Sequence, residues 1–414
     1  MNNRVIELTS DSLLSASDSR FDAMDFQRGF IMSLMALSHC QEYVAIKRYS
    51  NESWKESPYW LGTSLFELLN QIFISMMVSG GFFLMMGMGI IFLWEARLKQ
   101  GWPLNKICRY LIIRGGLLIF LQLTILQVFE IVAERKIFFY VGVLFALGAC
   151  MIVASIALYF IYKFKSKSFL SFMRIQYSIP ILLIICILAI SHVVARNLLL
   201  NNIQPSLWQN LLILGGKIQQ AGIEISVDFT PLPWFSAVLF GLILGQIVHI
   251  HKKHKFFILG SLSTLFLSSW LLIRLAQING IFSFGEHKIF LPNESPHIFS
   301  LFCMSKYPPS LSYFLWSFGM NLACIVFFNE IQKNSPMVSS IIKPFKVFGR
   351  SALFFFVTHW FVFYGLSLLL PQKIESLVTL ILIWVLGLMM LNVMCIAYYQ
   401  FKIKKAKNSF WRMF

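Results

Sequence analysis

Long apolar runs separated by short polar segments recur along the whole chain. The hydrocarbon core of a bilayer is about 30 Å thick, so a helix needs roughly 20 apolar residues to cross it. Windows of that length predict about ten membrane-spanning helices. Their expected bounds are 27–46, 64–94, 107–129, 137–162, 175–195, 232–250, 256–278, 309–329, 345–370 and 375–401. The pattern therefore predicts an all-α polytopic integral membrane protein.

The same pattern divides the chain into a polar N-terminal tail over 1–24, a transmembrane domain over 25–401 and a basic tail over 402–414. The N-terminal tail has no apolar core of its own, so it does not have the pattern of a cleavable signal peptide. The second apolar run is longer than one span requires. We expect it to tilt or to break near Gly80-Gly81.

The composition agrees with a membrane protein, because 57% of the residues are hydrophobic and only 13% are charged. The net charge of +17 does not indicate a nucleic-acid partner, since Lys and Arg are spread over the short segments between apolar runs. These residues are more frequent on the side of the two tails, which places both termini in the cytoplasm. The expected partners are the lipid bilayer and acidic ligands.

Ionisable residues inside the spans are the candidates for chemistry, because charge is costly in a bilayer. His39 lies in the outer half of the first span, and a neutral imidazole accepts a proton at physiological pH. His359 follows an aromatic stretch near the middle of the ninth span and is the second candidate. A hydrogen bond between helices would explain either histidine equally well.

Arginines near the inner ends of the spans form a second group of candidates. Arg114 lies in the third span and Arg350 opens the ninth, and a guanidinium binds phosphate through its planar fork. Arg28, three residues after Asp25, fits either a helix-start ion pair or an anchor near a cytoplasmic opening. Snorkelling to lipid headgroups is the alternative, and we prefer it for Arg109.

Other polar residues gather at the outer ends of the spans. Arg196, Asn197, Arg274 and Lys306 lie there, in or beside two long loops over 196–231 and 279–308. Anchoring at the membrane interface is the simpler explanation for such residues. Glu67, Asn70 and Gln71 lie within the second span, where they would line the same cavity as His39 or bond neighbouring helices. His249, His251 and His254 have no carboxylate or cysteine nearby, so we expect no metal.

Several motifs occur in an order typical of one family. They are Asp25-Phe26-Gln27-Arg28-Gly29, Met35-Ala36-Leu37-Ser38-His39, Arg114-Gly115, Leu232-Pro233-Trp234, Lys306 to Leu311, and Gly349-Arg350 to His359-Trp360. In this order the chain resembles the bacterial members of the heparan-alpha-glucosaminide N-acetyltransferase catalytic-domain family. The resemblance implies transfer of an acyl group from cytoplasmic acyl-CoA, acetyl-CoA first of all, to a sugar amine or hydroxyl on the far side of the membrane.

The resemblance also implies roles for the candidate residues. His39 and His359 would be catalytic, Arg28, Arg114 and Arg350 would bind acyl-CoA, and Arg196, Asn197, Arg274 and Lys306 would bind the acceptor. Ser38 stands where the family has Asp, and Ala195 to Leu200 lacks the family's His and Asp. The change at Ser38 removes an expected partner of His39.

Two alternatives to a working enzyme stay open at this point. One is a transporter of a small or lipid-linked solute, although the sequence shows no convincing repeat. The other is a non-catalytic relative of the acyltransferases, which the missing acidic residues would explain. The oligomeric state is also open, a homodimer included. We expect the protein in a bacterial inner membrane.

Overall fold

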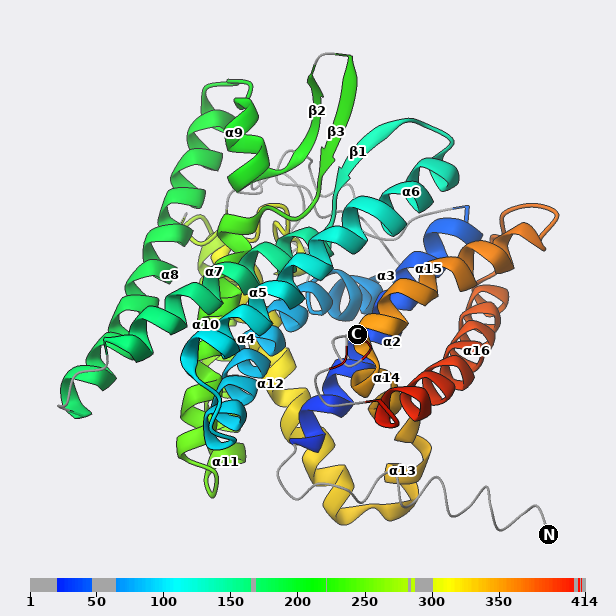
Figure 1. The fold of residues 1–414 in the computed structure, drawn as a ribbon. Helices are drawn as coiled ribbons and strands as arrows, with labels where there is room; N and C mark the ends of the chain where they lie inside the picture. Colours follow the sequence, from blue (N-terminus) through cyan, green and yellow to red (C-terminus); the bar gives the residue numbers. More distant parts are fainter. Residues whose placement is uncertain are drawn as a thin grey trace, which may run out of the picture.

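A computed structural model describes residues 21–46, 65–164, 169–220, 222–281, 284–286, 301–405, 409 and 411. Its long helices pack into one bundle (Figure 1). Helix α2 (Asp22–Val44) lies in the middle of this bundle and contacts α4, α12, α14, α15 and α16. Most of the predicted N-terminal tail, over 1–20, lies outside the described residues.

Eight helical stretches among the described residues are long and apolar enough to cross a membrane. They are Leu65–Lys99 (with α3 and α4), Leu104–Glu134 (with α5 and α6), Val143–Lys163 (α7), Tyr177–Leu200 (within α8), Pro231–Ile250 (α10), Lys255–Ile278 (α11), Leu311–Asn334 (α12) and Leu377–Ile403 (α16). The predicted ninth span is a bent pair, α14 (Lys343–Arg350) and α15 (Ala352–Leu368), with an angle of 102° between them. Helix α2 corresponds to the predicted first span but is not among the apolar stretches, because charged residues occur along it.

The predicted break in the second span is confirmed. Helix α3 (Leu65–Leu69) passes into a π-helical segment over Asn70–Ser75, and α4 (Val78–Lys99) begins just before Gly80. Helix α12 satisfies the backbone at this break, because the side chains of Ser317 and Asn321 both donate hydrogen bonds to the carbonyl of Met77, at 3.0 Å each. Polar side chains from a neighbouring helix are a usual way to stabilise a broken membrane helix.

A small sheet lies at one end of the bundle, which the all-α expectation did not include (Figure 1). Strand β3 (Ile223–Val227) pairs in parallel with β1 (Phe138–Val141) and antiparallel with β2 (Gly216–Gln220), in the order β1-β3-β2. The first of these strands lies inside the predicted fourth span, and the other two lie in the predicted outer loop over 196–231. Short α9 (Leu207–Gln209) and a π-helical turn over Asn210–Leu214 precede the hairpin. A strand of four or five residues is too short for its alternating pattern to be distinguished from part of an apolar run.

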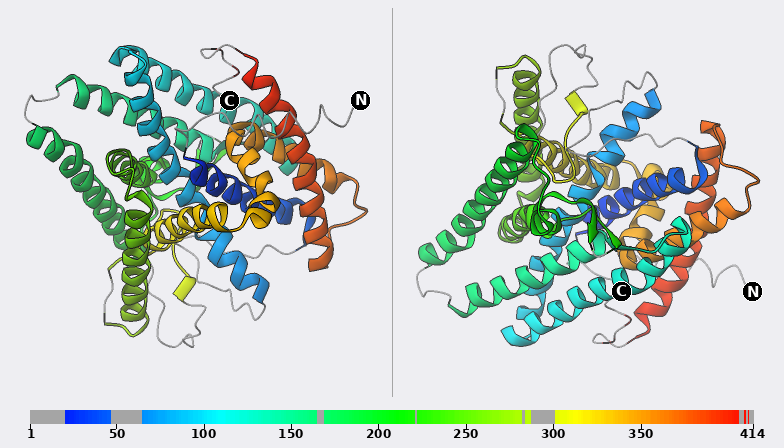
Figure 2. Two further views of the ribbon diagram at one scale, coloured as in Figure 1. Left: turned by 90° about the horizontal axis from the view of Figure 1, so that it is seen from below. Right: turned by 90° about the horizontal axis from the view of Figure 1, so that it is seen from above.

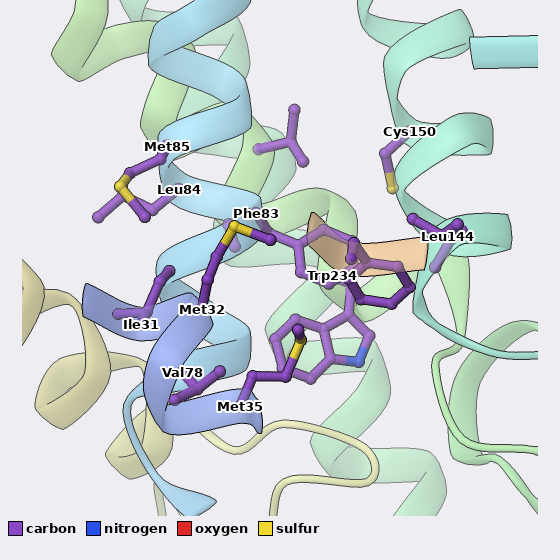
Figure 3. Close-up of a cluster of buried hydrophobic side chains, with 14 of the residues drawn as sticks. Ile31, Met32, Met35, Val78, Phe83, Leu84, Met85, Leu144, Cys150 and Trp234 are labelled. Atoms are coloured by element: carbon purple, nitrogen blue, oxygen red, sulfur yellow. The ribbon is translucent and has the colours of Figure 1, made fainter. Parts of the chain in front are cut away.

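The centre of the bundle is a cluster of aromatic and methionine side chains (Figure 3). The Trp234 ring of α10 stacks on Phe83 of α4 with 4.7 Å between ring centroids. Met32 and Met35 of α2 lie in the same cluster, and both are buried. Helices α4 and α10 approach closely because Gly87 and Gly241 face each other.

Candidate active site

One large cavity lies at the end of the bundle opposite the sheet. Its volume is about 1160 Å³, which exceeds the roughly 300–1,000 Å³ of an ordinary small-molecule pocket. Its walls come from α2, α4, α5, α7, α10, α11, α14, α15 and α16. A ligand as large as a nucleotide conjugate therefore has room inside it.

The mouth of this cavity is strongly basic. Its lining contains Arg28, Arg97, Lys99, Arg114, Lys252, Lys255, Arg350 and Lys402. Asp25 is the one acidic side chain among the described lining residues. Cationic groups gathered on low-dielectric walls attract anions and hold phosphate groups well. The three arginines expected to bind an anionic cofactor thus line one space, although they come from three separate helices.

An ion-pair network fixes two of these arginines. Arg28 Nη1 lies 3.4 Å from Asp25 Oδ1, which confirms the ion pair expected from their spacing. Arg350 Nη2 lies 3.3 Å from Asp22 Oδ1, and Lys346 Nζ lies 2.6 Å from the other oxygen of Asp22. The network joins the start of α2 to α14, so the two helices hold their arginines at a common edge of the cavity.

Two glycines next to these arginines allow the helices to touch. A Cβ at Gly29 would lie 1.7 Å from the carbonyl oxygen of Phe345, and a Cβ at Gly349 would lie 1.9 Å from that of Asp25. Both neighbours are backbone atoms, which cannot turn aside as a side chain would. The glycine in each motif therefore serves the close approach of α2 and α14, which in turn positions the adjacent arginine.

Arg114 differs from the other two arginines. It lies ten residues after the start of α5 at Leu104, or about 15 Å along the helix, and its side chain is partly buried in the cavity wall. No described carboxylate forms an ion pair with it. Arg109, on the same helix, is exposed and lies outside the cavity lining, as the snorkelling interpretation expects.

The inner part of the cavity is apolar. Met32, Leu118, Leu144, Met151 and Phe356 line it. The cavity thus changes from a charged region suited to phosphates into an apolar region that ends within the bundle.

The two candidate histidines lie together just beyond that apolar end. The rings of His39 on α2 and His359 on α15 have centroids 5.1 Å apart, and the Trp360 ring lies 4.1 Å from that of His39. His359 is fully buried, whereas the His39 side chain keeps 20% of its surface exposed. One histidine of the pair therefore reaches the surface of the bundle, while the other is enclosed.

Hydrogen bonding distinguishes the two nitrogens of each ring. His359 Nδ1 lies 3.2 Å from the carbonyl oxygen of Phe355, which can only accept, so Nδ1 carries the proton of the neutral ring. Nε2 then has a free lone pair, and it has no hydrogen-bond partner among the described residues. The indole N–H of Trp360 is likewise buried without a partner there. A lone pair and an N–H donor are thus both available beside His39.

A comparison with protein families identifies the family of this chain. A family model described as "Heparan-alpha-glucosaminide N-acetyltransferase, catalytic" matches residues 20–274, more than half of the chain. The chain belongs to this family. No curated protein matches it. Membership confirms the resemblance drawn from the motifs and places the chain among membrane acyltransferase-like proteins.

The matched region of this family member contains Arg28, His39 and Arg114. Arg350 and His359 lie beyond its end at Arg274, and the fold brings them to the same place. Arg350 lines the cavity with Arg28 and Arg114, and the His359 ring lies against that of His39. The C-terminal helices are therefore part of the same candidate site as the matched region.

Glu42 supplies the carboxylate that Ser38 does not. Its Oε2 lies 3.2 Å from His39 Nδ1, and both side chains are partly exposed. Glu42 was not among the predicted residues; its spacing of three residues from His39 was the available signal, since such residues share a helix face. A carboxylate on Nδ1 holds the ring and leaves Nε2 of His39 as the proton acceptor.

More acidic groups surround the sheet end of the site. The Tyr140 hydroxyl of β1 donates a hydrogen bond to Asp228 Oδ2 at 3.0 Å. Burial raises the pKa of Tyr140 well above its usual value, and the charges of Asp228, Glu130 and Glu42 raise that pKa further. These three carboxylates therefore act on one region, close to the exposed side of His39.

The residues expected to bind an acceptor do not gather at the histidine pair. Arg196 and Asn197 are on α8, which packs on α10 and lies across the bundle from α15 (Figure 2). Asn197 is exposed, and its side-chain oxygen accepts a hydrogen bond from Asn201. Both residues were expected to bind the acceptor because they lie at the outer end of a helix. That position does not determine which side of the bundle they occupy.

Arg274 and Lys306 belong to a second buried region. Arg274 is 1% exposed and donates hydrogen bonds to the carbonyl oxygens of Leu301 and Cys303. Its contacts are those of an anchor for the chain before α12. Lys306 is buried in that same segment, with Nζ 4.9 Å from the centroid of the Tyr307 ring.

Glu286 holds the same segment and was not noticed in the sequence. Its two oxygens accept hydrogen bonds from the Ser305 backbone at 2.9 Å and from the Ser310 hydroxyl at 2.7 Å. No periodic pattern surrounds Glu286, so its burial could not be inferred from sequence.

The polar residues of the second span bond neighbouring segments. Asn70 accepts a hydrogen bond from Gln41 of α2 at 2.7 Å, and Gln71 donates one to the carbonyl of Phe302 at 3.2 Å. These contacts show bonding to neighbouring segments, which is one of the two roles expected for these residues. Among the described residues, no group of three or more His, Cys, Asp or Glu side chains is arranged to hold a metal ion.

Proposed function

We propose that this protein is a transmembrane acyltransferase that takes an acyl group from acyl-CoA and transfers it to a sugar amine or hydroxyl on the other side of the membrane. One observation carries the proposal. A single cavity is basic at its mouth and apolar at its inner end, and that end lies one helical turn before His359, since Phe356 lines it. The shape matches the two chemically different halves of an acyl-CoA.

The donor would lie with its phosphates at the mouth and its thioester at the apolar end. Arg28, Arg114 and Arg350 would bind the phosphate oxygens through charge-assisted hydrogen bonds. The aliphatic arm of the donor would contact the methionines and leucines of the inner wall. Acetyl-CoA is the proposed donor, because the description of the family names an N-acetyltransferase.

Transfer would use His39 as a general base. Glu42 accepts a hydrogen bond from the Nδ1–H of His39, so Nε2 can take the proton of the acceptor as its nitrogen or oxygen attacks the thioester carbon. The thiolate of CoA then leaves and takes a proton from His39, which returns the ring to its neutral form. Such proton transfer typically contributes about 10²–10⁴-fold to a rate.

His359 and Trp360 would assist at the carbonyl. The free lone pair on His359 Nε2 makes this residue the second candidate for a base or nucleophile. The Trp360 indole N–H would donate to the oxygen of the thioester carbonyl as negative charge develops there. Carboxylates at the sheet end would favour an acceptor that carries an amine.

The orientation follows from the same proposal. The basic mouth would face the cytoplasm, where acyl-CoA is made, with both termini on that side and the sheet outside. The lysines and arginines of the predicted inner segments support this direction. A bacterial inner membrane is the proposed location.

The test uses the purified full-length protein in liposomes. Acetyl-CoA with a labelled acetyl group is added on one side and glucosamine on the other, and labelled N-acetylglucosamine is measured. We expect His39→Ala to abolish transfer and to keep acetyl-CoA binding, while His254→Ala, in an exposed turn, keeps both. Transfer by His39→Ala at the wild-type rate would contradict the role of His39. Labelled donor that crosses the membrane without forming product would instead favour a transporter.

A further inference from the structure

Helix α15 carries the cavity wall and the histidine on one continuous face. Ala352, Leu353 and Phe356 of α15 line the cavity, and Phe356 follows the other two at spacings of four and three residues. His359 is the next residue in this series, because positions three or four apart share a helix face. His359 itself is fully buried and is not part of the cavity lining.

Helix α2 repeats this arrangement from the other side. Arg28 and Met32 line the cavity, Met35 and Ala36 are buried one turn later, and His39 follows. The two helices pack together, and their histidine rings meet. The cavity and the histidine pair therefore lie in line, and side chains of these two helices separate them.

Phe356 is the main side chain between the cavity and the histidine pair. It is 5% exposed, it lines the inner end of the cavity, and its ring meets the His359 ring at 68° with centroids 5.5 Å apart. Met32 lies at the same end and is 1% exposed. A methionine can change rotamer and fill a space of variable shape, whereas a phenylalanine ring has a fixed size.

We propose that Phe356 closes the acyl end of the donor cavity and restricts the donor to short acyl groups. This inference rests on the proposed function and extends it to donor selection. An acetyl group adds two carbons to the thiol, and displacement of the Met32 side chain would make room for it. A longer chain would have to occupy the volume of the Phe356 ring, so it would bind only if that ring were removed.

The experiment measures the affinity of purified protein for acetyl-CoA, butanoyl-CoA and hexanoyl-CoA. The variants are Phe356→Ala and Phe356→Leu, the second being a smaller change if the first does not fold. Phe354→Ala is the matched control, because Phe354 is on the same helix, stacks on Tyr398 of α16 with 4.3 Å between centroids, and does not line the cavity.

We expect the wild type and Phe354→Ala to bind acetyl-CoA best and to lose affinity as the chain lengthens. Phe356→Ala should reverse this order, with a gain of about fourfold for each methylene that the new space buries. Phe356→Leu should lie between them.

Two results would overturn the role of Phe356. One is an unchanged order of affinities in Phe356→Ala with CoA binding intact, and the other is a wild type that binds all three donors equally. A wild type that binds no CoA derivative would refute the donor site itself, and the proposed function with it.

Discussion

Replacement of Arg114 by Gln tests the donor cavity most directly. The change removes one positive charge and leaves a shorter, uncharged polar side chain. Arg114 lies about 15 Å along α5, and no described carboxylate offsets its charge. Arg28 and Arg350, by contrast, share their charges with Asp25 and Asp22.

The expected size of the effect follows from the contact that is lost. A hydrogen bond to a charged group is worth about 1.5–3 kcal/mol. Its loss should weaken the binding of acetyl-CoA by roughly 10- to 150-fold. Part of this loss should disappear at high salt, because screening also weakens the wild-type contact.

The assay is calorimetric titration of acetyl-CoA into the purified protein at low and at high salt. Arg109→Gln is the matched control, since it removes the same charge from the same helix at an exposed position outside the cavity. We expect this control to stay within about twofold of the wild type. An unchanged affinity in Arg114→Gln, or an equal loss in both variants, would refute a phosphate contact at Arg114.

Three other variants and one control address the rest of the site. Glu42→Gln should slow acetyl transfer roughly tenfold or more, because His39 loses its anionic partner. Donor binding should not weaken, because the cavity is intact. Initial rates of acetyl transfer and the affinity for acetyl-CoA check both expectations. Gly349→Ala should lower the free energy of unfolding by about 1–3 kcal/mol through a clash with backbone, seen as a lower melting temperature in detergent. Gly116→Ala, where a Cβ meets nothing within 4 Å, should not destabilise. Tyr140→Phe should cost about 1 kcal/mol at neutral pH. Because the folded-state pKa of Tyr140 is raised, that contribution is complete below pH about 10 and falls as the pH rises toward the folded-state pKa, which melting curves at several pH values would show.

The sequence predicted those features that depend on long apolar runs and on helical spacing. The bundle, the broken second span and the pairing of Asp25 with Arg28 belong to this class. The meeting of Arg114 with Arg350 in one cavity was expected from their depth and their chemistry.

Other features depend on how distant segments meet, which no local pattern encodes. The family's carboxylate partner for His39 would stand at the position of Ser38, yet the carboxylate beside His39 is that of Glu42 on the same helix. The charge of Arg274 is visible in the sequence, whereas the backbone carbonyls that it holds are not. The sheet was missed since its strands are as short as four residues.

Because the cavity wall and His359 share one face of α15, the site depends on the number of residues between them. Each residue added to a helix turns everything after it by about 100°. A single insertion between Phe356 and His359 would leave the donor cavity whole and aim the imidazole elsewhere. Substitutions in this short stretch can adjust what is accepted, whereas insertions and deletions there would uncouple the two halves of the site.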